Sequence, residues 1–138
     1  MLISLHPKWC GLILNERKTI EVRRRAPHLD VPFTMYLYCT KEKEPSWMVG
    51  IRGKRESYQM NGKVCGEVTC VGIEEVFPPY RDKLEGTCLT GKELYTYVGM
   101  SDKIYFLRLA NPITYNVPKS LEEFGQKHPP QSWYYVEV

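Results

Sequence analysis

Residues 16–25 read ERKTIEVRRR and lie where a helical pattern gives way to a strand pattern. Five of these ten side chains are cationic and two are carboxylates. Along the strand, a period of two places Glu21, Arg23 and Arg25 on one face and the two apolar residues of the stretch on the other. We therefore expect an apolar face toward the core and a polar face held rigidly enough for a binding site. The alternative is a solvated run of charges.

The elements on both sides of this junction indicate a mixed fold. A short strand at 2–5 precedes a helix that begins at Pro7 and continues to about Arg17. Capping boxes at 90–93 and 120–123 predict a helix over 91–98 and a short helical turn. Further strands are predicted at 33–40, 63–74, 103–110 and 133–138. Strands dominate and hairpins connect several of them, which favours a compact α+β barrel over a doubly wound α/β sheet.

Residues 41–62 differ from the rest of the chain. They contain three glycines and the basic run RGKR at 52–55, with Trp47 and Tyr58 as their only aromatic residues. We expect a long loop or a loose hairpin here. Loops of this length in compact domains are usually functional or disordered.

Composition limits the classes of protein that remain. The 138 residues predict one domain over 1–138, with an N-terminal half that is net positive and a C-terminal half that is net negative. A one-sided positive field suits a polyanion or a phosphate-bearing ligand. Five cysteines without a Cys-x-x-Cys pair predict buried free thiols in a reducing cytosol, with no metal site and no cofactor. The first residues show no apolar h-region and no small-residue cleavage site, and no apolar run reaches bilayer length, so we expect a cytoplasmic protein without a membrane partner.

Glu67 is the second candidate site residue. It lies in a strand whose other members are mostly small or apolar, where an unpaired buried carboxylate is costly. If Lys18, Glu21 and Glu67 converge, they form an acid–base set for opening an amide or a phosphoester, or a set that grips a ligand without chemistry. The alternative for Glu67 is an edge-strand residue facing water. His6 and Cys10, four residues apart, are a weaker candidate for a nucleophile pair.

Three short blocks resemble the ASCH domain family. The first is 7–23, in which a helix leads into a G-x-K-T-x-E-x-R type junction, with Glu16 at the usual glycine position. The second is the strand 64–68 with its Gly-Glu pair, and the third is the closing pattern 132–136. The resemblance covers nearly the whole chain and is to the compact bacterial and phage type. It implies a PUA-like fold, a small mixed β-barrel with flanking short helices.

The resemblance also implies a ligand and candidate roles. Family members are thought to bind RNA or nucleotides beside the junction. One branch is similar to an amidohydrolase that deacetylates N4-acetylcytidine with a lysine, a threonine and a glutamate. Lys18 and Glu67 match two of these positions, whereas Glu21 stands at the threonine position. Other members are assigned ribonuclease activity.

We therefore expect a module that binds RNA or a modified nucleoside. Lys18 and Arg23 would meet phosphate or a base edge, Glu21 and Glu67 would accept hydrogen bonds from base amino groups, and Arg25 and Trp9 complete the ligand-binding set. Two alternatives stay open. One is a hydrolase, an amidohydrolase or a ribonuclease, that uses Lys18, Glu21 and Glu67. The other is a protein-interaction module of a transcription or translation assembly.

Overall fold

A computed structural model describes residues 1–48 and 58–137 of the chain, so the basic run at 52–55 lies outside the described residues. The elements in chain order are β1 (Leu2–Leu5), α1 (Pro7–Leu14), β2 (Ile20–Arg23), β3 (Phe33–Cys39), β4 (Lys63–Val76), the 3-10 helix η1 (Arg81–Lys83), α2 (Gly91–Val98), β5 (Ile104–Lys119), the 3-10 helix η2 (Leu121–Phe124) and β6 (Trp133–Tyr134).

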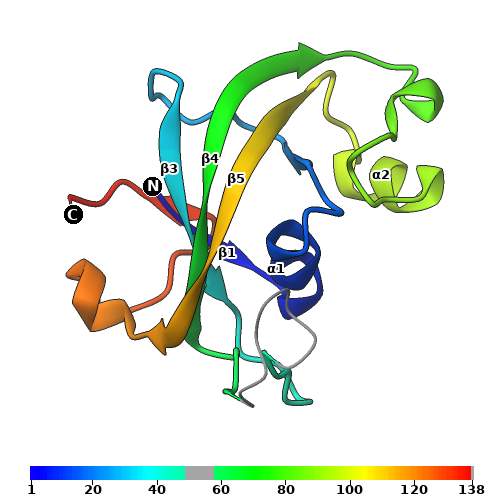
Figure 1. The fold of residues 1–138 in the computed structure, drawn as a ribbon. Helices are drawn as coiled ribbons and strands as arrows, with labels where there is room; N and C mark the ends of the chain where they lie inside the picture. Colours follow the sequence, from blue (N-terminus) through cyan, green and yellow to red (C-terminus); the bar gives the residue numbers. More distant parts are fainter. Residues whose placement is uncertain (49–57, 138) are drawn as a thin grey trace.

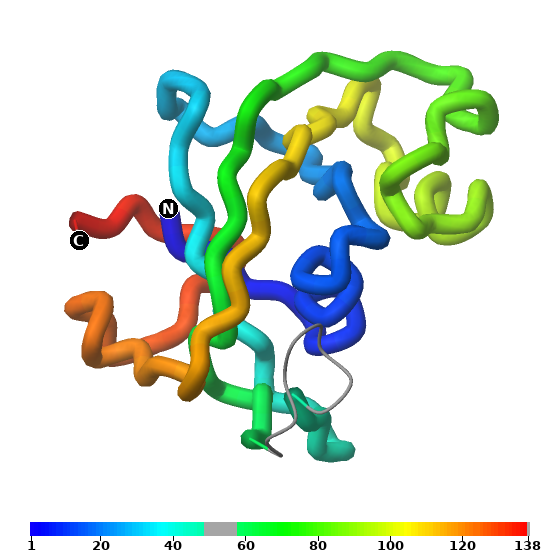
Figure 2. Tube along the Cα trace, in the orientation of Figure 1, coloured from blue at the N-terminus to red at the C-terminus, as the bar shows by residue number. Residues whose placement is uncertain are grey.

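The strands form one mixed sheet in the order β2-β5-β4-β3-β1-β6. Among the strands of the described residues, β1 and β3 pair in parallel and the other neighbours pair antiparallel. The long strands β4 and β5 run side by side as a curved ribbon, and the connection between them contains α2 (Figure 1). The C-terminal segment returns beside the N-terminal strand (Figure 2). The result is a half-barrel with two short helices, which confirms the predicted α+β, PUA-like fold.

Apolar residues on the two faces of the sheet form separate clusters. On β1, Ile3 faces the cluster covered by α1, whereas Leu2 faces the cluster completed by η2. A third cluster joins Ile20 and Val22 of β2 to Leu94 of α2. The predicted core face of the junction is thus confirmed, because both of its apolar residues are buried against α2.

Helix α1 ends in a Schellman motif. The N–H of Glu16 bonds to the carbonyl of Ile13 at 3.0 Å, and the N–H of Arg17 bonds to that of Leu12 at 2.9 Å. Glu16 occupies the left-handed position of this motif with φ 62°. Glycine adopts this conformation without steric cost, which explains a glycine preference at this place in the junction pattern.

Gly66 of β4 lies where α1 crosses the sheet. A Cβ at this position would lie 2.5 Å from the carbonyl oxygen of Ile113 and 2.7 Å from a methyl group of Leu14. The glycine of the Gly-Glu pair therefore serves helix–sheet packing.

Several predicted boundaries are wrong. Strand β5 continues to Lys119 instead of ending at 110, because Asn111 adopts φ 55° and a register shift against β4 absorbs the interruption. Helix α1 ends at Leu14 rather than near 17, and β6 spans only two residues. Within 41–62, Trp47 and Gln59 form an antiparallel bridge, as a loose hairpin requires. The cysteines are free, but Cys88 is exposed rather than buried.

Candidate functional site

The backbone around the junction is fixed by hydrogen bonds to distant segments. The N–H of Lys18 bonds to the carbonyl of Leu12 at 3.0 Å, and the N–H groups of Thr19 and Ile20 both bond to the carbonyl of Gly86. Gly86 has φ 85°, and a Cβ there would lie 2.7 Å from the hydroxyl of Thr19. The 86–87 segment can approach β2 this closely because residue 86 has no side chain. It thereby meets Lys18 directly.

A buried charge network occupies the polar face of β2. One oxygen of Glu21 lies 3.5 Å from the ammonium group of Lys18, and the other accepts a hydrogen bond from Nε of Arg23 at 2.8 Å. Lys18 and Glu21 are only 2% and 7% exposed. Lys18 also donates to the carbonyl of Thr87 at 2.6 Å. The predicted clustering of one carboxylate among cations is therefore present, inside the protein rather than in solvent.

Arg23 connects three elements. Besides its bond to Glu21, it donates from one terminal nitrogen to the hydroxyl of Ser132 and from the other to the carbonyl of Ser4, each at 3.0 Å. Its guanidinium nitrogens are thus engaged within the protein. Because Arg23 also lines the cavity described below, its expected contact with phosphate or a base edge stays a prediction.

Burial shifts the pKa of Lys18. Loss of solvent lowers the pKa of its ammonium group, and the neighbouring carboxylate of Glu21 opposes that effect only in part. Among the described residues, Glu21 is the carboxylate that pairs with Lys18. An amine with a lowered pKa gives up its proton more readily near neutral pH than a solvated lysine does.

A cavity of about 670 Å³, here named the main cavity, opens onto this network. Such a volume is typical of small-molecule pockets. Trp9 forms part of its wall, with the ammonium groups of Lys8 and Lys18 at 4.7 Å and 5.0 Å from the ring centroid. The polar residues that line it are Ser4, His6, Lys18, Glu21, Arg23, Thr40, Lys92, Glu93, Thr96, Tyr97 and Gln131.

The contribution of α2 to this wall was not anticipated from the sequence. Lys92, Thr96 and Tyr97 line the main cavity, while Leu94 on the other side of the helix is buried in the core. The spacing of these polar residues marks one helix face, which is a detectable signal. The sequence pattern did not reveal that this face lies opposite α1.

Glu67 does not reach the main cavity, so the expected convergence of Lys18, Glu21 and Glu67 is wrong. Successive residues of a strand point to opposite faces, and Gly66 faces α1. Glu67 therefore faces the other side, where it accepts a hydrogen bond from the hydroxyl of Tyr115 at 3.0 Å. Burial is the main cause of the raised pKa of the Tyr115 hydroxyl, and the carboxylate of Glu67 raises it further.

The remaining candidates also separate. Arg25 follows the end of β2, is exposed, and lies 5.8 Å from the ring of Trp133 rather than along the main cavity. His6 pairs with Glu42 at 2.5 Å, whereas Cys10 is buried in the core, so the two do not form a nucleophile pair. In the described part of the chain, no three His, Cys, Asp or Glu side chains are grouped to hold a metal ion.

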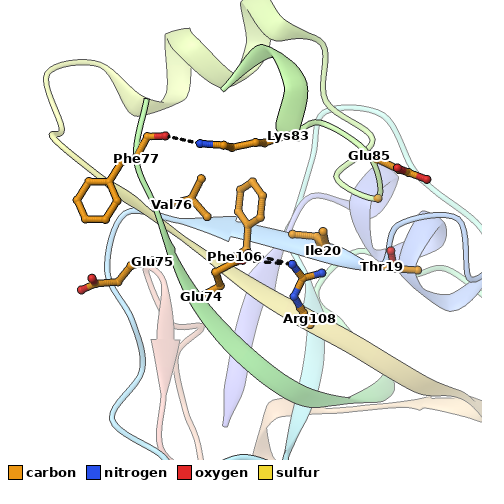
Figure 3. A pocket seen from close by; sticks show the side chains of 11 residues that line it. Thr19, Ile20, Glu74, Glu75, Val76, Phe77, Lys83, Glu85, Phe106 and Arg108 are labelled. Atoms are coloured by element: carbon orange, nitrogen blue, oxygen red, sulfur yellow. Dashed lines mark hydrogen bonds and ion pairs between the residues drawn. The ribbon is translucent and has the colours of Figure 1, made fainter. Parts of the chain in front are cut away.

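A second cavity of about 630 Å³ lies on the other side of the junction, where Thr19 and Ile20 line it (Figure 3). Both of its cationic side chains already have partners within the protein. Arg108 pairs with Glu74 at 2.9 Å, and Lys83 donates to the carbonyl of Phe77 at 2.9 Å. The main cavity, with its buried network and its aromatic wall, is the stronger candidate site.

Comparisons with known proteins support the fold. The crystal structure of ASCH from Zymomonas mobilis matches with a TM-score of 0.70 and 22% identity, over 95% of this chain and 82% of that chain. A tyrosine-to-phenylalanine mutant of the same protein matches at 0.70 and 21%, over 95% and 85% of the two chains. A serine-to-alanine mutant matches at 0.71 and 20%, over 95% and 83%. No family model and no curated protein matches the sequence.

These similarities confirm the resemblance to ASCH domains at the level of the fold. At this identity they carry no ligand and no activity across to the chain. None of the helices within 1–48 and 58–137 has the length and apolar character needed to cross a bilayer.

Proposed function

We propose that the protein binds single-stranded RNA or a modified nucleoside in the main cavity. The observation that carries this proposal is the buried Lys18–Glu21–Arg23 network at the base of a cavity with an aromatic wall. A buried carboxylate held between two cations is costly to assemble, because each charge loses its hydration. Such a cost is commonly retained at functional sites.

The lining groups suit a nucleotide. Trp9 and Tyr97 offer ring surfaces for a base, and stacking on aromatic side chains is the usual device for unpaired bases. Lys92 is exposed on α2 and is available for a phosphate. Lys18 donates to the carbonyl of Thr87 and has further protons to offer a base edge. In this proposal Arg23 and Glu21 form the floor of the cavity, and the side chains of α2 contact the nucleotide.

Equilibrium binding of a fluorescent eight-nucleotide RNA of mixed sequence tests the proposal. We expect affinity to fall as salt rises, with a log–log slope of about −0.7 for each phosphate contact. Tyr97→Ala should weaken binding by about 5- to 150-fold, the range for loss of one base–aromatic stack. Lys92→Gln should weaken binding and make the slope shallower. Lys83→Gln, an exposed lysine of the second cavity, is the matched control.

The proposal fails if the wild-type protein does not bind this RNA or a panel of modified nucleosides. It also fails if Tyr97→Ala and Lys83→Gln bind the RNA as tightly as each other, because the main cavity would then not be the site.

Hydrolysis of a nucleoside amide or of RNA is a second candidate, favoured by the lowered pKa of Lys18. With N4-acetylcytidine as substrate, water would add to the amide carbonyl and cytidine and acetate would be released. Glu67 lies too far around the sheet to take part, and Glu21 stands where a hydroxyl nucleophile is expected, so Lys18 would act as the base toward water. Chromatographic detection of cytidine, lost in Lys18→Met, supports this candidate; absence of product excludes this substrate.

A further inference from the structure

A third cavity, of about 350 Å³, adjoins the main cavity and is here named the basic cavity. The two cavities share Ser4 and Thr40 as lining residues. Thr40 directly follows β3, and its N–H bonds to the carbonyl of Leu5 at 2.9 Å, which ties the shared wall to β1. A ligand that fills the main cavity therefore has a neighbouring compartment into which its next group can extend.

The charges around the basic cavity have one sign. Lys41, Lys127 and His128 line it, and no Asp or Glu does. Within the described residues, none of these three side chains takes part in an ion pair. This distinguishes the basic cavity from the second cavity, in which the cation Arg108 has its own carboxylate partner.

The wall that the two cavities share also contains a polar group without a partner. The hydroxyl oxygen of Thr40 is buried and has no hydrogen-bond partner within the described residues. An unsatisfied buried hydroxyl carries a desolvation cost that a ligand oxygen would remove. The position of the Lys41 side chain is partly fixed, because it lies across Gly62, where a Cβ would be 3.2 Å from the Cε atom of Lys41. The glycine leaves room for the lysine stem.

We propose that the basic cavity binds a phosphate group of the nucleotide strand whose base occupies the main cavity. The inference rests on the function proposed above and specifies its ligand further: a phosphate-bearing strand instead of a free nucleoside. Lys41 and Lys127 supply the two ammonium groups, and the hydroxyl of Thr40 donates to a phosphate oxygen. Contacts of this kind fix the position of a strand, while the base is recognised elsewhere.

The test compares Lys41→Gln/Lys127→Gln with Lys83→Gln/Lys103→Gln, which removes the same charge from lysines outside both the main and the basic cavity. Binding of the eight-nucleotide RNA is measured over a range of salt. The first double variant should lose at least about tenfold in affinity, because one charge-assisted hydrogen bond alone contributes that much, and its log–log salt slope should become shallower by about 0.7. The control should change both quantities much less. Thr40→Val should weaken RNA binding, whereas Thr40→Ser should retain it.

A second arm measures the affinity of the wild-type protein for cytidine, for its 5′- and 3′-monophosphates and for the RNA. Tighter binding of a monophosphate than of cytidine assigns the phosphate to a single nucleotide, and tighter binding of the RNA alone assigns it to a strand. If RNA binding depends on Tyr97 but the two double variants behave alike, the basic cavity has no role and the proposed function still stands. If the wild-type protein binds none of these ligands, the phosphate inference falls, and the proposed function falls with it when the panel of modified nucleosides also fails to bind.

Discussion

Replacing Glu21 with glutamine should cost far more stability than breaking an ion pair on the surface. The substitution keeps the size of the side chain and one oxygen acceptor, but it removes the negative charge that faces Lys18 at 3.5 Å and Arg23 at 2.8 Å. Two neighbouring cations would then remain in a site where Lys18 is 2% exposed. Breaking a buried ion pair by removing one partner costs about 3–5 kcal/mol. Because glutamine still accepts a hydrogen bond from Arg23, we expect a cost of about 3 kcal/mol.

Glu74→Gln is the matched control. Glu74 forms a comparable contact of 2.9 Å with Arg108, but about half of each side chain is exposed. Exposed pairs contribute at most about 1 kcal/mol, since water and salt screen them. Urea unfolding followed by circular dichroism measures the free energy of unfolding of both variants and the wild type. Adding 1 M salt should reduce the loss in free energy of unfolding caused by Glu74→Gln. It should leave most of the loss caused by Glu21→Gln, because buried charges are screened little.

The reasoning is refuted if the two substitutions cost the same free energy. Equal costs would show that Glu21 is solvated and that the network at the base of the main cavity does not hold in solution. A large loss for Glu21→Gln together with a changed denaturant slope would instead point to an altered unfolded state.

Three further predictions follow from the local geometry. Glu16→Gly should be more stable than Glu16→Ala by about 1 kcal/mol in thermal unfolding, because both remove the side chain and only glycine relieves the φ of 62°; equal stabilities would contradict the left-handed turn. Gly66→Ala should destabilise the fold by about 1–3 kcal/mol through overpacking against Leu14, whereas Gly125→Ala meets no atom within 4 Å and should cost only its backbone strain. Burial lowers the pKa of Lys18 below 10.5, so the unfolded state binds more protons between the folded pKa and 10.5, and the stability contributed by Lys18 rises with pH through that window. The free energy of unfolding of the wild type, measured relative to that of Lys18→Met, should therefore increase as pH rises toward 10.5. A difference between the two proteins that stays constant with pH would show that Lys18 is solvated.

Local signals predicted the elements that position the site. The capping box at Thr90 is present, with reciprocal bonds between Thr90 and Glu93, and α2 begins and ends as predicted. The alternation along β2 is also confirmed, because Val22 is buried while Glu21 and Arg23 meet on the other face. These features depend on backbone geometry within a few residues, so the sequence pattern expresses them directly.

The error at Glu67 has a topological cause. Strand alternation puts Glu67 and Gly66 on opposite faces, but the sequence pattern does not say which of the two faces α1. In the sheet, β5 lies between β2 and β4, so the polar face of β2 and the strand that carries Glu67 are not neighbours. Arg23 shows the same limit, since its partners Ser4 and Ser132 lie far from it in the chain.

The amino-acid sequence alone thus determined the α+β class, the helix caps and the face of β2 on which Glu21 lies, because each depends on short-range periodicity and turn chemistry. Tertiary structure decided which groups share a cavity. Strand order and helix packing brought Trp9 of α1, the β2 network and Tyr97 of α2 together and sent Glu67 to the opposite face. Those contacts join residues distant in the chain, and their geometry is set by how whole elements bury their apolar faces.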